Sequence, residues 1–350
     1  EERRGDLLAQ AAALRAGERR VKEIIARHGL KDFQGAIAAM HDLSEAAMRA
    51  QLAKLPDGVF EGEDFLDDGG PEDGPVGVRV RIEKQGENIL FDFSASDDAI
   101  AGPLNTTRFV AGSAAYYAVR ALSDQPIQPN GGCYRPVTIK TRPGSIFDPG
   151  PDKPVVGGNH ETSQRAVDAI FRALEPAIGE RLTAGCNTSA GLLIFSGPTA
   201  EGRWATFYEA HGGGEGARDH RDGHPVTRVH LTNVMATPIE VIEAEYPIRL
   251  ERQQLRAGSG GEGRHVGGEG MIRDYRVIGR GLTLTTMFER RLIPPYGLRG
   301  GEDGQPMRVT LHRDGKAREL RGRENLALEP EDLVRVETPG GGGYGAVLTP

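Results

Sequence analysis

The sequence is poor in the residues that mark several classes of protein. It has two cysteines, Cys133 and Cys186, far apart and without CxxC spacing. We therefore expect no disulfide framework, and a reducing compartment, the cytoplasm, fits better. No run of 18 apolar residues occurs, so we expect no membrane span, and no signal peptide is apparent.

Basic residues are also too few to favour a nucleic-acid partner. The formal net charge is −7, and no long run of Lys and Arg occurs. Binding to a phosphate backbone requires a basic face, because Lys and Arg must displace the condensed counterions. We therefore expect a protein that does not bind nucleic acid.

Glycine is abundant, at 49 of 350 residues, about twice the usual ~7%. Ordinary turns would explain one glycine cluster, but repeated clusters near expected strands favour tightly packed loops around a shared feature. We expect these loops and two helix starts to shape one anion-tolerant cavity that a second polypeptide completes. The clusters lie in the second half of the chain, at 212–216, 258–263, 267–270, 300–301 and 340–345.

None of these clusters has the sequence of a nucleotide-binding loop. A P-loop requires Lys-Ser or Lys-Thr after its last glycine, and no cluster supplies that pair. A dinucleotide site requires glycines between a strand and a following helix, whereas these glycines precede expected strands. We therefore expect that the chain does not bind a nucleotide itself.

Hydrophobic periodicity predicts an α+β chain with a helical N-terminal segment, a mixed α/β centre and a strand-rich, glycine-loop C-terminal part. The expected domains are 1–58, 59–247 and 248–350. Helices are expected over 6–29, with Asp6 as the N-cap, and over 30–55, 106–122 and 162–178. Strands are expected over 76–83, 88–94, 138–141, 154–156, 192–195, 204–209, 226–233, 239–243, 271–278, 282–290, 307–312 and 333–336.

One segment, 209–230, gathers four of the nine histidines with several acidic residues. Three interpretations remain open: a metal site, a loop with catalytic or substrate contacts, and plain surface. His220 and His224 have i,i+4 spacing, but Gly223 and Pro225 make a helix there unfavourable. The candidate residues of the segment are Glu209, His211, Asp219, His220, Asp222, His224 and His230.

Three further polar elements are candidates for a site. Asp92 alternates with Phe91 and Phe93, which places it on the opposite face of a strand from the two rings. The segments 102–107 and 157–163 each lead a glycine turn into a polar helix start. Such a start either caps its own helix or binds an anion.

Twelve segments in this order resemble the hydantoinase B/oxoprolinase family, and together they span nearly the whole chain. They are Gly5–Gln10, Asp92–Ser94, Gly102–Thr107, Asn130–Pro136, Gly158–Arg165, Tyr208-Glu209 with 212–218, Asp222-Gly223, Thr232-Asn233, Pro238–Glu240, Arg256–Gly270, Glu289-Arg290 with Pro294–Leu298, and Thr338–Gly345. Two positions depart from the family pattern: Ser94-Ala95-Ser96 replaces a glycine-threonine pair, and His211 stands where smaller residues are common.

The resemblance implies one subunit, or one half, of an ATP-dependent cyclic-amide hydrolase of the hydantoinase or 5-oxoprolinase type. It implies an ATP-binding partner subunit of the hydantoinase A type, and a phosphorylated amide oxygen as the activated state. Family members begin with a longer N-terminal region that carries His and Asp metal ligands. The present chain starts after that region, so we expect a divalent metal in the complex with its usual ligands outside this chain. Two alternatives stay open: a separate N-terminal polypeptide supplies the ligands, or this chain is not catalytic alone.

Our first hypothesis is therefore a hydrolase subunit acting on a cyclic amide, with Glu209 or His211 as the proton-transfer groups. Alternatives are a subunit of an ATP-dependent ketone carboxylase, of the acetone or acetophenone type, and a non-catalytic assembly subunit. The residues expected to bind substrate are Asp92, Asn105, Thr107, Asn159 and Arg218. We expect no metal ligand and no nucleotide-binding residue in this chain.

Overall fold

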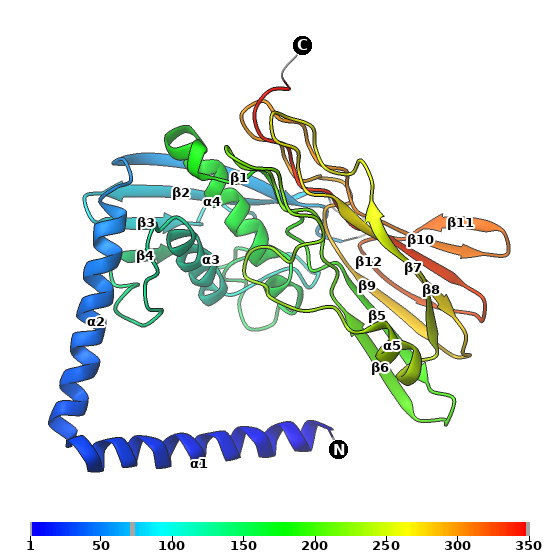
Figure 1. Ribbon diagram of the computed structural model, residues 1–350, viewed down its shortest axis with the longest axis horizontal. Coiled ribbons are helices and arrows are strands. Elements are labelled where there is room, and N and C mark those ends of the chain that lie inside the picture. Colours follow the sequence, from blue (N-terminus) through cyan, green and yellow to red (C-terminus); the bar gives the residue numbers. More distant parts are fainter. Residues whose placement is uncertain (1, 71–73, 348–350) are drawn as a thin grey trace. The chain divides into compact units, whose positions relative to one another are not determined.

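The computed structural model describes residues 2–70 and 74–347, which pack as two compact units (Figure 1). The first unit comprises the residues up to 54 together with 123–136, and the second comprises 55–122 and the chain from 137 onward. The described residues contain five α-helices and three β-sheets. The expected mixture of helices and strands is thus confirmed, whereas the expected three-domain division stays a prediction.

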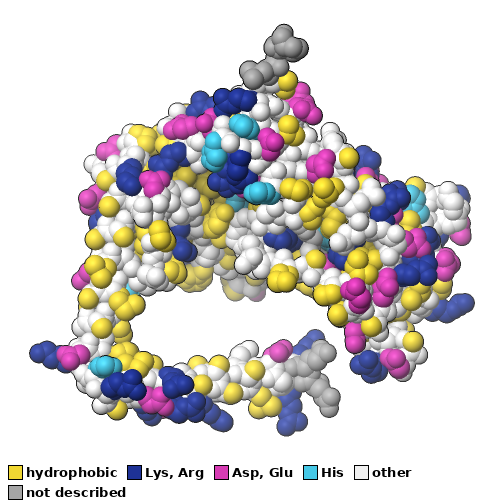
Figure 2. Space-filling model, in the orientation of Figure 1, with side chains coloured by type: hydrophobic (Ala, Val, Ile, Leu, Met, Phe, Trp, Pro, Cys, Tyr) yellow, Lys and Arg dark blue, Asp and Glu magenta, His cyan; other side chains and the backbone are white. Residues whose placement is uncertain are grey.

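The first unit is built on two long helices, α1 (Glu2–His28) and α2 (Leu30–Leu52). Gly29 separates them with a φ of 82°, a conformation that glycine adopts without strain. The expected N-cap at Asp6 is wrong, because α1 already includes Glu2. Figure 2 shows apolar side chains along both helices, and the exposed ones are Leu7, Leu8, Leu14, Val21, Ile24, Leu30, Ile37, Met40 and Leu43.

The segment 123–136 packs against α2 and completes this unit. Asn130 donates a hydrogen bond from Nδ2 to Ser44 Oγ at 2.8 Å. Gly132 lies so close to α2 that a Cβ atom there would stand 2.0 Å from the carbonyl oxygen of His41. Only glycine fits this position without moving the helix.

The second unit begins with a four-stranded sheet in the order β1-β2-β3-β4. Its strands are β1 (Gly58–Leu66), β2 (Val76–Gln85), β3 (Asn88–Asp92) and β4 (Val137–Lys140), and only the β3–β4 pair is parallel. Two helices accompany it, α3 (Arg108–Ala121) and α4 (Thr162–Ile178), and α4 packs on β1 and β2 (Figure 1). A Cβ at Gly62 of β1 would lie 2.4 Å from the Ala173 amide nitrogen, so this glycine allows the close approach.

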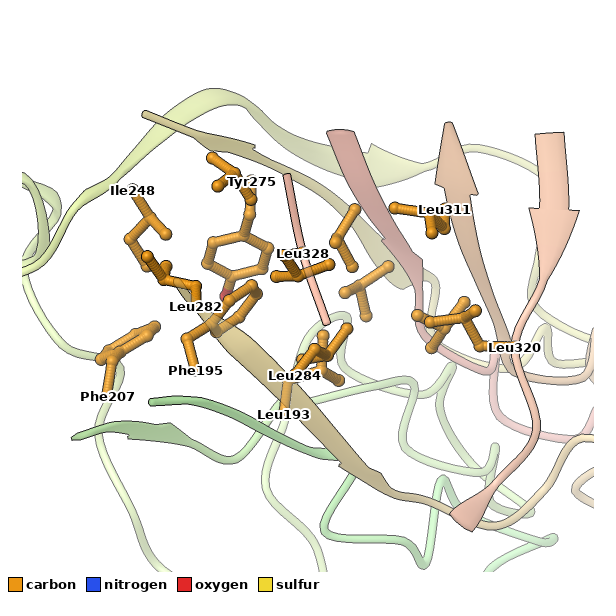
Figure 3. Close-up of a cluster of buried hydrophobic side chains, with 14 of the residues drawn as sticks. Leu193, Phe195, Phe207, Ile248, Tyr275, Leu282, Leu284, Leu311, Leu320 and Leu328 are labelled. Atoms are coloured by element: carbon orange, nitrogen blue, oxygen red, sulfur yellow. The ribbon is translucent and has the colours of Figure 1, made fainter. Parts of the chain in front are cut away.

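Two further sheets face each other across an apolar core. The five-stranded sheet has the order β11-β10-β13-β8-β7, and the four-stranded sheet has the order β12-β9-β5-β6. Figure 3 shows Tyr275 of the first sheet beside Phe195 and Leu284 of the second. The strands are β5 (Leu192–Pro198), β6 (Trp204–Glu209), β7 (Ile248–Arg256), β8 (Gly270–Val277), β9 (Thr283–Met287), β10 (Arg308–Arg313), β11 (Lys316–Glu319), β12 (Arg323–Ala327) and β13 (Leu333–Glu337).

The pairing of β5 with β9 crosses the boundary that we expected at residue 247. Sheet formation between residues so distant in sequence is invisible to periodicity, because each strand carries the same alternation whichever strand it joins.

The glycine clusters pack against one another rather than projecting as separate turns. A Cβ at Gly214 would lie 1.9 Å from the Gly268 carbonyl oxygen, and one at Gly267 would lie 1.9 Å from that of Gly341. The amide of Gly341 donates to Gly268, and that of Gly214 donates to Pro339. Because such amides are satisfied by backbone carbonyls, the clusters form a solid packing region and not the open anion-binding cavity that we expected.

Several expected strands are wrong for identifiable reasons. Residues 226–233 form no strand, because Val226, His230 and Leu231 have positive φ angles of 48°, 37° and 46°. The expected strand over 239–243 is the helix α5 (Ile239–Glu245), which starts directly after Pro238. Residues 154–156 lead into the short 3₁₀ helix Gly157–Asn159 instead of forming a strand.

Candidate functional site

A pocket of about 290 Å³ in the second unit collects residues from three of the twelve segments that carry the resemblance. These segments supply Asn159, His160 and Gln164 near the start of α4, Tyr208 and Glu209 at the end of β6, and Thr232 and Asn233 in the irregular loop that follows. The other lining residues are Ala190, Ala210, Arg228, Leu231, Val234, Met235 and Thr237.

Glu209 is the acidic residue of this pocket. It is the last residue of β6 and is 4% exposed. Its Oε2 lies 2.8 Å from Arg273 Nη1 and accepts a hydrogen bond from the Tyr275 hydroxyl at 3.0 Å. Its Oε1 accepts from the Thr237 amide at 3.2 Å. A buried carboxylate is stable only when paired in this way, and the pairing fixes its orientation at the pocket wall.

His211 lies behind Glu209, is fully buried and does not line the pocket. Its Nδ1 lies 2.7 Å from the carbonyl oxygen of Gly191, and its Nε2 lies 2.7 Å from the Tyr275 hydroxyl. Because a carbonyl only accepts, Nδ1 must carry a hydrogen. Burial lowers the pKa of His211 to about 4, although the nearby charge of Glu209 opposes that shift. The imidazole is therefore neutral near pH 7.

The Tyr275 hydroxyl thus stands between two acceptors, the Glu209 carboxylate and Nε2 of a neutral His211. It has a single proton and can donate to only one of them at a time. The chain Glu209–Tyr275–His211 can consequently take up one further proton and form both hydrogen bonds. Such a chain is suited to accept a proton at the pocket wall and return it.

Arg228 is the cationic residue of the pocket. Its Nη1 donates to the carbonyl oxygens of Ala190 at 3.0 Å and His211 at 2.6 Å, and its Nη2 donates to Thr232 Oγ1 at 3.2 Å. Its Nε is buried and has no hydrogen-bond partner among the described residues. Arg228 therefore organises the pocket wall without being neutralised by a carboxylate.

Tyr208 and His160 form a second polar pair on the wall. The Tyr208 hydroxyl lies 3.2 Å from His160 Nε2, and His160 Nδ1 lies 3.2 Å from the Val156 carbonyl oxygen. The Nδ1 hydrogen thus goes to the carbonyl, and Nε2 forms a hydrogen bond with the tyrosine hydroxyl. Burial raises the pKa of Tyr208, so its hydroxyl remains a donor near neutral pH.

One buried glutamate, Glu161, lies beside the pocket residue Ala190, and a second, Glu289, lies close enough to Glu161 to influence its pKa. Glu161 accepts from the Ala190 amide through Oε1 at 3.1 Å, and its Oε2 has no partner among the described residues. Burial and the charge of Glu289 raise the pKa of Glu161 to about 8. Burial and the charge of Asp67 raise the pKa of Glu289 to about 7.

Of the residues expected to bind substrate, only Asn159 lines this pocket, together with Glu209. Asn105 is fully buried, and its side chain holds the backbone of its own loop through Ile100, Gly102 and Pro154. Asp92 accepts from Lys140 Nζ at 2.8 Å. Burial would raise the pKa of Asp92, but hydrogen bonds from Lys140 and Ser94 outweigh it and hold the pKa low.

Thr107 and Arg218 also lie outside the pocket lining. Thr107 is the N-cap residue of α3, and its side chain makes no capping hydrogen bond. Arg218 donates to Glu215 Oε1 at 3.1 Å in a separate cluster with Arg221. The structure therefore does not gather the expected substrate residues in one place, and their roles stay predictions.

The histidine-rich segment is dispersed by the fold. His265 pairs with Asp222 at 3.3 Å, whereas His230 lies 2.9 Å from the Tyr117 hydroxyl. Within residues 2–70 and 74–347, no group of three or more His, Cys, Asp or Glu side chains is arranged to hold a metal ion. In the same residues, no helix is long and apolar enough to cross a membrane.

Sequence reasoning missed Arg228, Arg273 and Tyr275. Arg228 lies in the segment 226–233, which we expected to be a strand. The positive φ angles of Val226, His230 and Leu231, which prevent that strand, leave no trace in the hydrophobic periodicity. Arg273 and Tyr275 share one face of β8 with Met271 and Val277, and this face reads as that of an ordinary strand. They lie close to Glu209 only because the five-stranded sheet that contains β8 packs against the four-stranded sheet that contains β6.

A second, larger hollow of about 560 Å³ lies at the β5–β6 turn and the end of α5. It contains none of the segments that carry the resemblance, and its lining includes Glu201, Glu243, Glu245 and Arg280. The pocket at Glu209 is therefore the candidate active site.

The fold and this pocket define an α/β protein with a buried acid at a cleft formed by helix starts and strand ends. The family model for hydantoinase B/oxoprolinase matches residues 1–347. The chain therefore belongs to the hydantoinase B/oxoprolinase family.

Several relatives are similar over nearly the whole chain. A 5-oxoprolinase of Dictyostelium discoideum is 30% identical over 97% of this chain and 26% of its own length. An ATP-dependent caprolactamase from Pseudomonas jessenii has a solved structure with a TM-score of 0.88 and 26% identity, covering 98% of this chain and 61% of its own. Acetone carboxylase, at 17% identity and a TM-score of 0.83, covers 93% of this chain and 50% of its own and shares the fold.

The chain spans only part of these relatives. It covers 26% of the 5-oxoprolinase and 59% of an archaeal relative from Methanocaldococcus jannaschii that is 34% identical. The activities of the whole relatives therefore bear on this chain only as proposals.

Proposed function

We propose that the chain is a subunit of a cytoplasmic, ATP-dependent cyclic-amide hydrolase of the hydantoinase or 5-oxoprolinase type. Family membership supports the class, and the relatives named 5-oxoprolinase and ATP-dependent caprolactamase support the cyclic amide. The observation that carries the proposal is Glu209 at the pocket wall, joined through Tyr275 to the buried His211.

Opening a cyclic amide with water requires a base for the attacking water and an acid for the ring nitrogen. Glu209 can take the proton from water, because its Oε1 accepts a hydrogen bond from the Thr237 amide alone and can accept another from the water. The Tyr275 hydroxyl can then reorient between Glu209 and His211, so the proton can be held until the ring nitrogen leaves. Tyr208 and Asn159 supply further polar groups toward the bound ring.

ATP enters this proposal through a separate subunit of the hydantoinase A type. The chain has no P-loop sequence, and the ATP dependence is that of the related enzymes. ATP would make the amide carbon more electrophilic by phosphorylating its oxygen, with ADP as the leaving group. After water adds to this carbon, expulsion of the protonated ring nitrogen would leave an acyl phosphate, and its hydrolysis by a second water would release inorganic phosphate and the ring-opened acid. A divalent metal would be held by another polypeptide, because the described residues offer no ligand cluster for one.

The test is ATP-dependent ring opening by the chain assembled with its ATP-binding partner. Glu209→Gln removes the base but keeps the shape, and we expect turnover to fall roughly 100- to 10,000-fold. Glu251→Gln is the matched control, because Glu251 is a partly exposed glutamate of β7 that pairs with Arg276. The substrates are 5-oxoproline, hydantoin and caprolactam.

Unchanged turnover of Glu209→Gln and His211→Ala would favour a non-catalytic assembly subunit. A ketone carboxylase is the second enzymatic candidate, because acetone carboxylase shares the fold. Bicarbonate-dependent ATP hydrolysis with acetone or acetophenone, and none with cyclic amides, would favour that candidate.

A further inference from the structure

Arg228 differs from the fully buried arginines of the same unit. Arg165, Arg273 and Arg290 each have a carboxylate oxygen within 4 Å. Arg228 lies half-buried on the pocket wall, and no carboxylate of the described residues lies within salt-bridge distance of it. A cation withdrawn from water without a counter-charge is costly, so its retention at a pocket points to an anion supplied from outside.

The guanidinium still has hydrogens to donate. Nη1 directs both of its hydrogens to backbone carbonyls, whereas Nη2 donates one of two to Thr232. The hydrogen on Nε is buried and has no partner among the described residues. One hydrogen on Nη2 therefore remains for a ligand, next to the unpaired one on Nε, and the side chain is held in position by three other contacts. Fixed guanidinium donors suit an oxyanion better than a flexible ammonium does.

We propose that Arg228 recognises an oxyanion of the bound substrate and so acts as a specificity-determining residue of the pocket. This inference rests on the proposed function and names the ligand chemistry of the same pocket. The oxyanion has two possible sources: a carboxylate on the ring, and the phosphoryl group of the activated amide. Leu231 and Val234, which also line the pocket, offer apolar surface to the methylene groups of a small ring.

Binding in the full chain without ATP separates these sources and does not depend on turnover. The probes are 5-oxoproline, its uncharged analogue 2-pyrrolidinone, and inorganic phosphate, each measured by isothermal titration calorimetry. We expect Arg228→Gln to weaken the binding of an oxyanion probe roughly 10- to 100-fold and to leave 2-pyrrolidinone within about twofold. A loss confined to 5-oxoproline assigns the ring carboxylate, and a loss confined to phosphate assigns the phosphoryl group.

Arg228 also donates hydrogen bonds to two backbone carbonyls, so its replacement could weaken binding by disturbing the fold. Two further variants separate that effect from a loss of ligand contacts. Arg228→Lys keeps the charge but loses the planar donors, and we expect an intermediate loss of oxyanion binding. Arg142→Gln is the matched control, since Arg142 donates to the carbonyls of Ser94 and Ser96 away from the pocket.

The inference is overturned if Arg228→Gln, at an unchanged melting temperature, binds every probe as the wild type does. An equal loss for 2-pyrrolidinone and the oxyanions would also overturn it, since that result indicates a structural role. If Arg228→Gln unfolds, equal binding of all probes by Arg228→Lys and wild type decides against it. If Arg228→Gln loses oxyanion binding as expected, but the wild-type enzyme assembled with its ATP-binding partner opens no cyclic amide, the result counts against the proposed function alone.

Discussion

Arg290 and Arg228 occupy the same unit and illustrate two uses of a buried guanidinium. Arg290 is fully buried, and all three of its nitrogens meet acceptors. Its Nη2 lies 3.1 Å from Asp64 Oδ2 and 2.7 Å from Asp168 Oδ2, so β1 and α4 are tied to the loop after β9. Arg228 instead contacts carbonyls and a hydroxyl, leaves Nε unpartnered and lines a pocket.

The segments that carry the family resemblance contain both charges that stabilise the fold and charges that line the pocket. Both Glu289-Arg290 and Tyr208-Glu209 belong to segments that carry the resemblance, yet only the second pair reaches the pocket. A closed ion cluster holds the fold together, whereas an incompletely paired charge beside a cavity can meet a ligand.

The largest effect is expected from opening the Arg290 cluster. Arg290→Met should lower the free energy of unfolding by about 3–5 kcal/mol, because it leaves Asp64 and Asp168 buried without their shared cation. Urea unfolding monitored by fluorescence and circular dichroism measures this change. Arg280→Met replaces an exposed arginine and should stay within about 0.5 kcal/mol of the wild type. A decrease in the free energy of unfolding below about 1 kcal/mol for Arg290→Met would show that the cluster contributes little to stability.

The sequence predicted much of the fold because long helices and alternating strands have local signals. The helices that match α2, α3 and α4, and the hairpin of β2 and β3, follow from spacing alone. The strand β1 was missed because Gly62 and the buried Asp64 interrupt the apolar pattern of its inner face, between Phe60 and Leu66. Its partner β2 has a buried alternation and was found.

The candidate site was predictable only in part. Glu209 and Asn159 come from polar segments that the sequence singles out, and both line the pocket. Arg228, Arg273 and Tyr275 could not be assigned, because their proximity to Glu209 arises from long-range pairing of β8 and from a loop with left-handed residues. Asn105 was expected at the site because of its place before a helix, but its amide serves its own loop.

A smaller effect is expected on the pH dependence of the free energy of unfolding, through Glu161 beside the pocket. The pKa of Glu161 is raised to about 8, so the folded state keeps a proton that the unfolded state loses above its ordinary value of 4.5. Stability from this group is therefore complete at low pH and declines as pH rises toward 8, with a slope approaching about 1.4 kcal/mol per pH unit. Glu161→Gln should flatten that decline in urea-unfolding experiments at several pH values between 5 and 8.

Glu289 titrates close to Glu161, with a pKa raised to about 7, so part of the decline should survive in Glu161→Gln. Glu175→Gln is the control, because Glu175 is a partly exposed glutamate of α4 that pairs with Arg299. Its stability profile should follow that of the wild type. An equally steep decline in Glu161→Gln and wild type would contradict the assignment of a protonated, buried acid beside the pocket.

The smallest of these effects concerns Tyr275, which links the acid of the pocket to His211. Tyr275→Phe keeps a ring beside Phe195, whose centroid lies 5.3 Å away, and removes only the hydroxyl. We expect turnover of the assembled enzyme to fall about tenfold, less than for Glu209→Gln, with the acidic limb of the kcat–pH profile displaced. The displacement is the informative readout, because a lost packing contact would lower stability without moving the profile. Tyr246→Phe supplies the comparison, since Tyr246 packs on Phe207 of the same core at 5.0 Å. If both tyrosine variants keep the wild-type profile, Glu209 works without the relay, and the pocket differs from the Arg290 cluster in its openness alone.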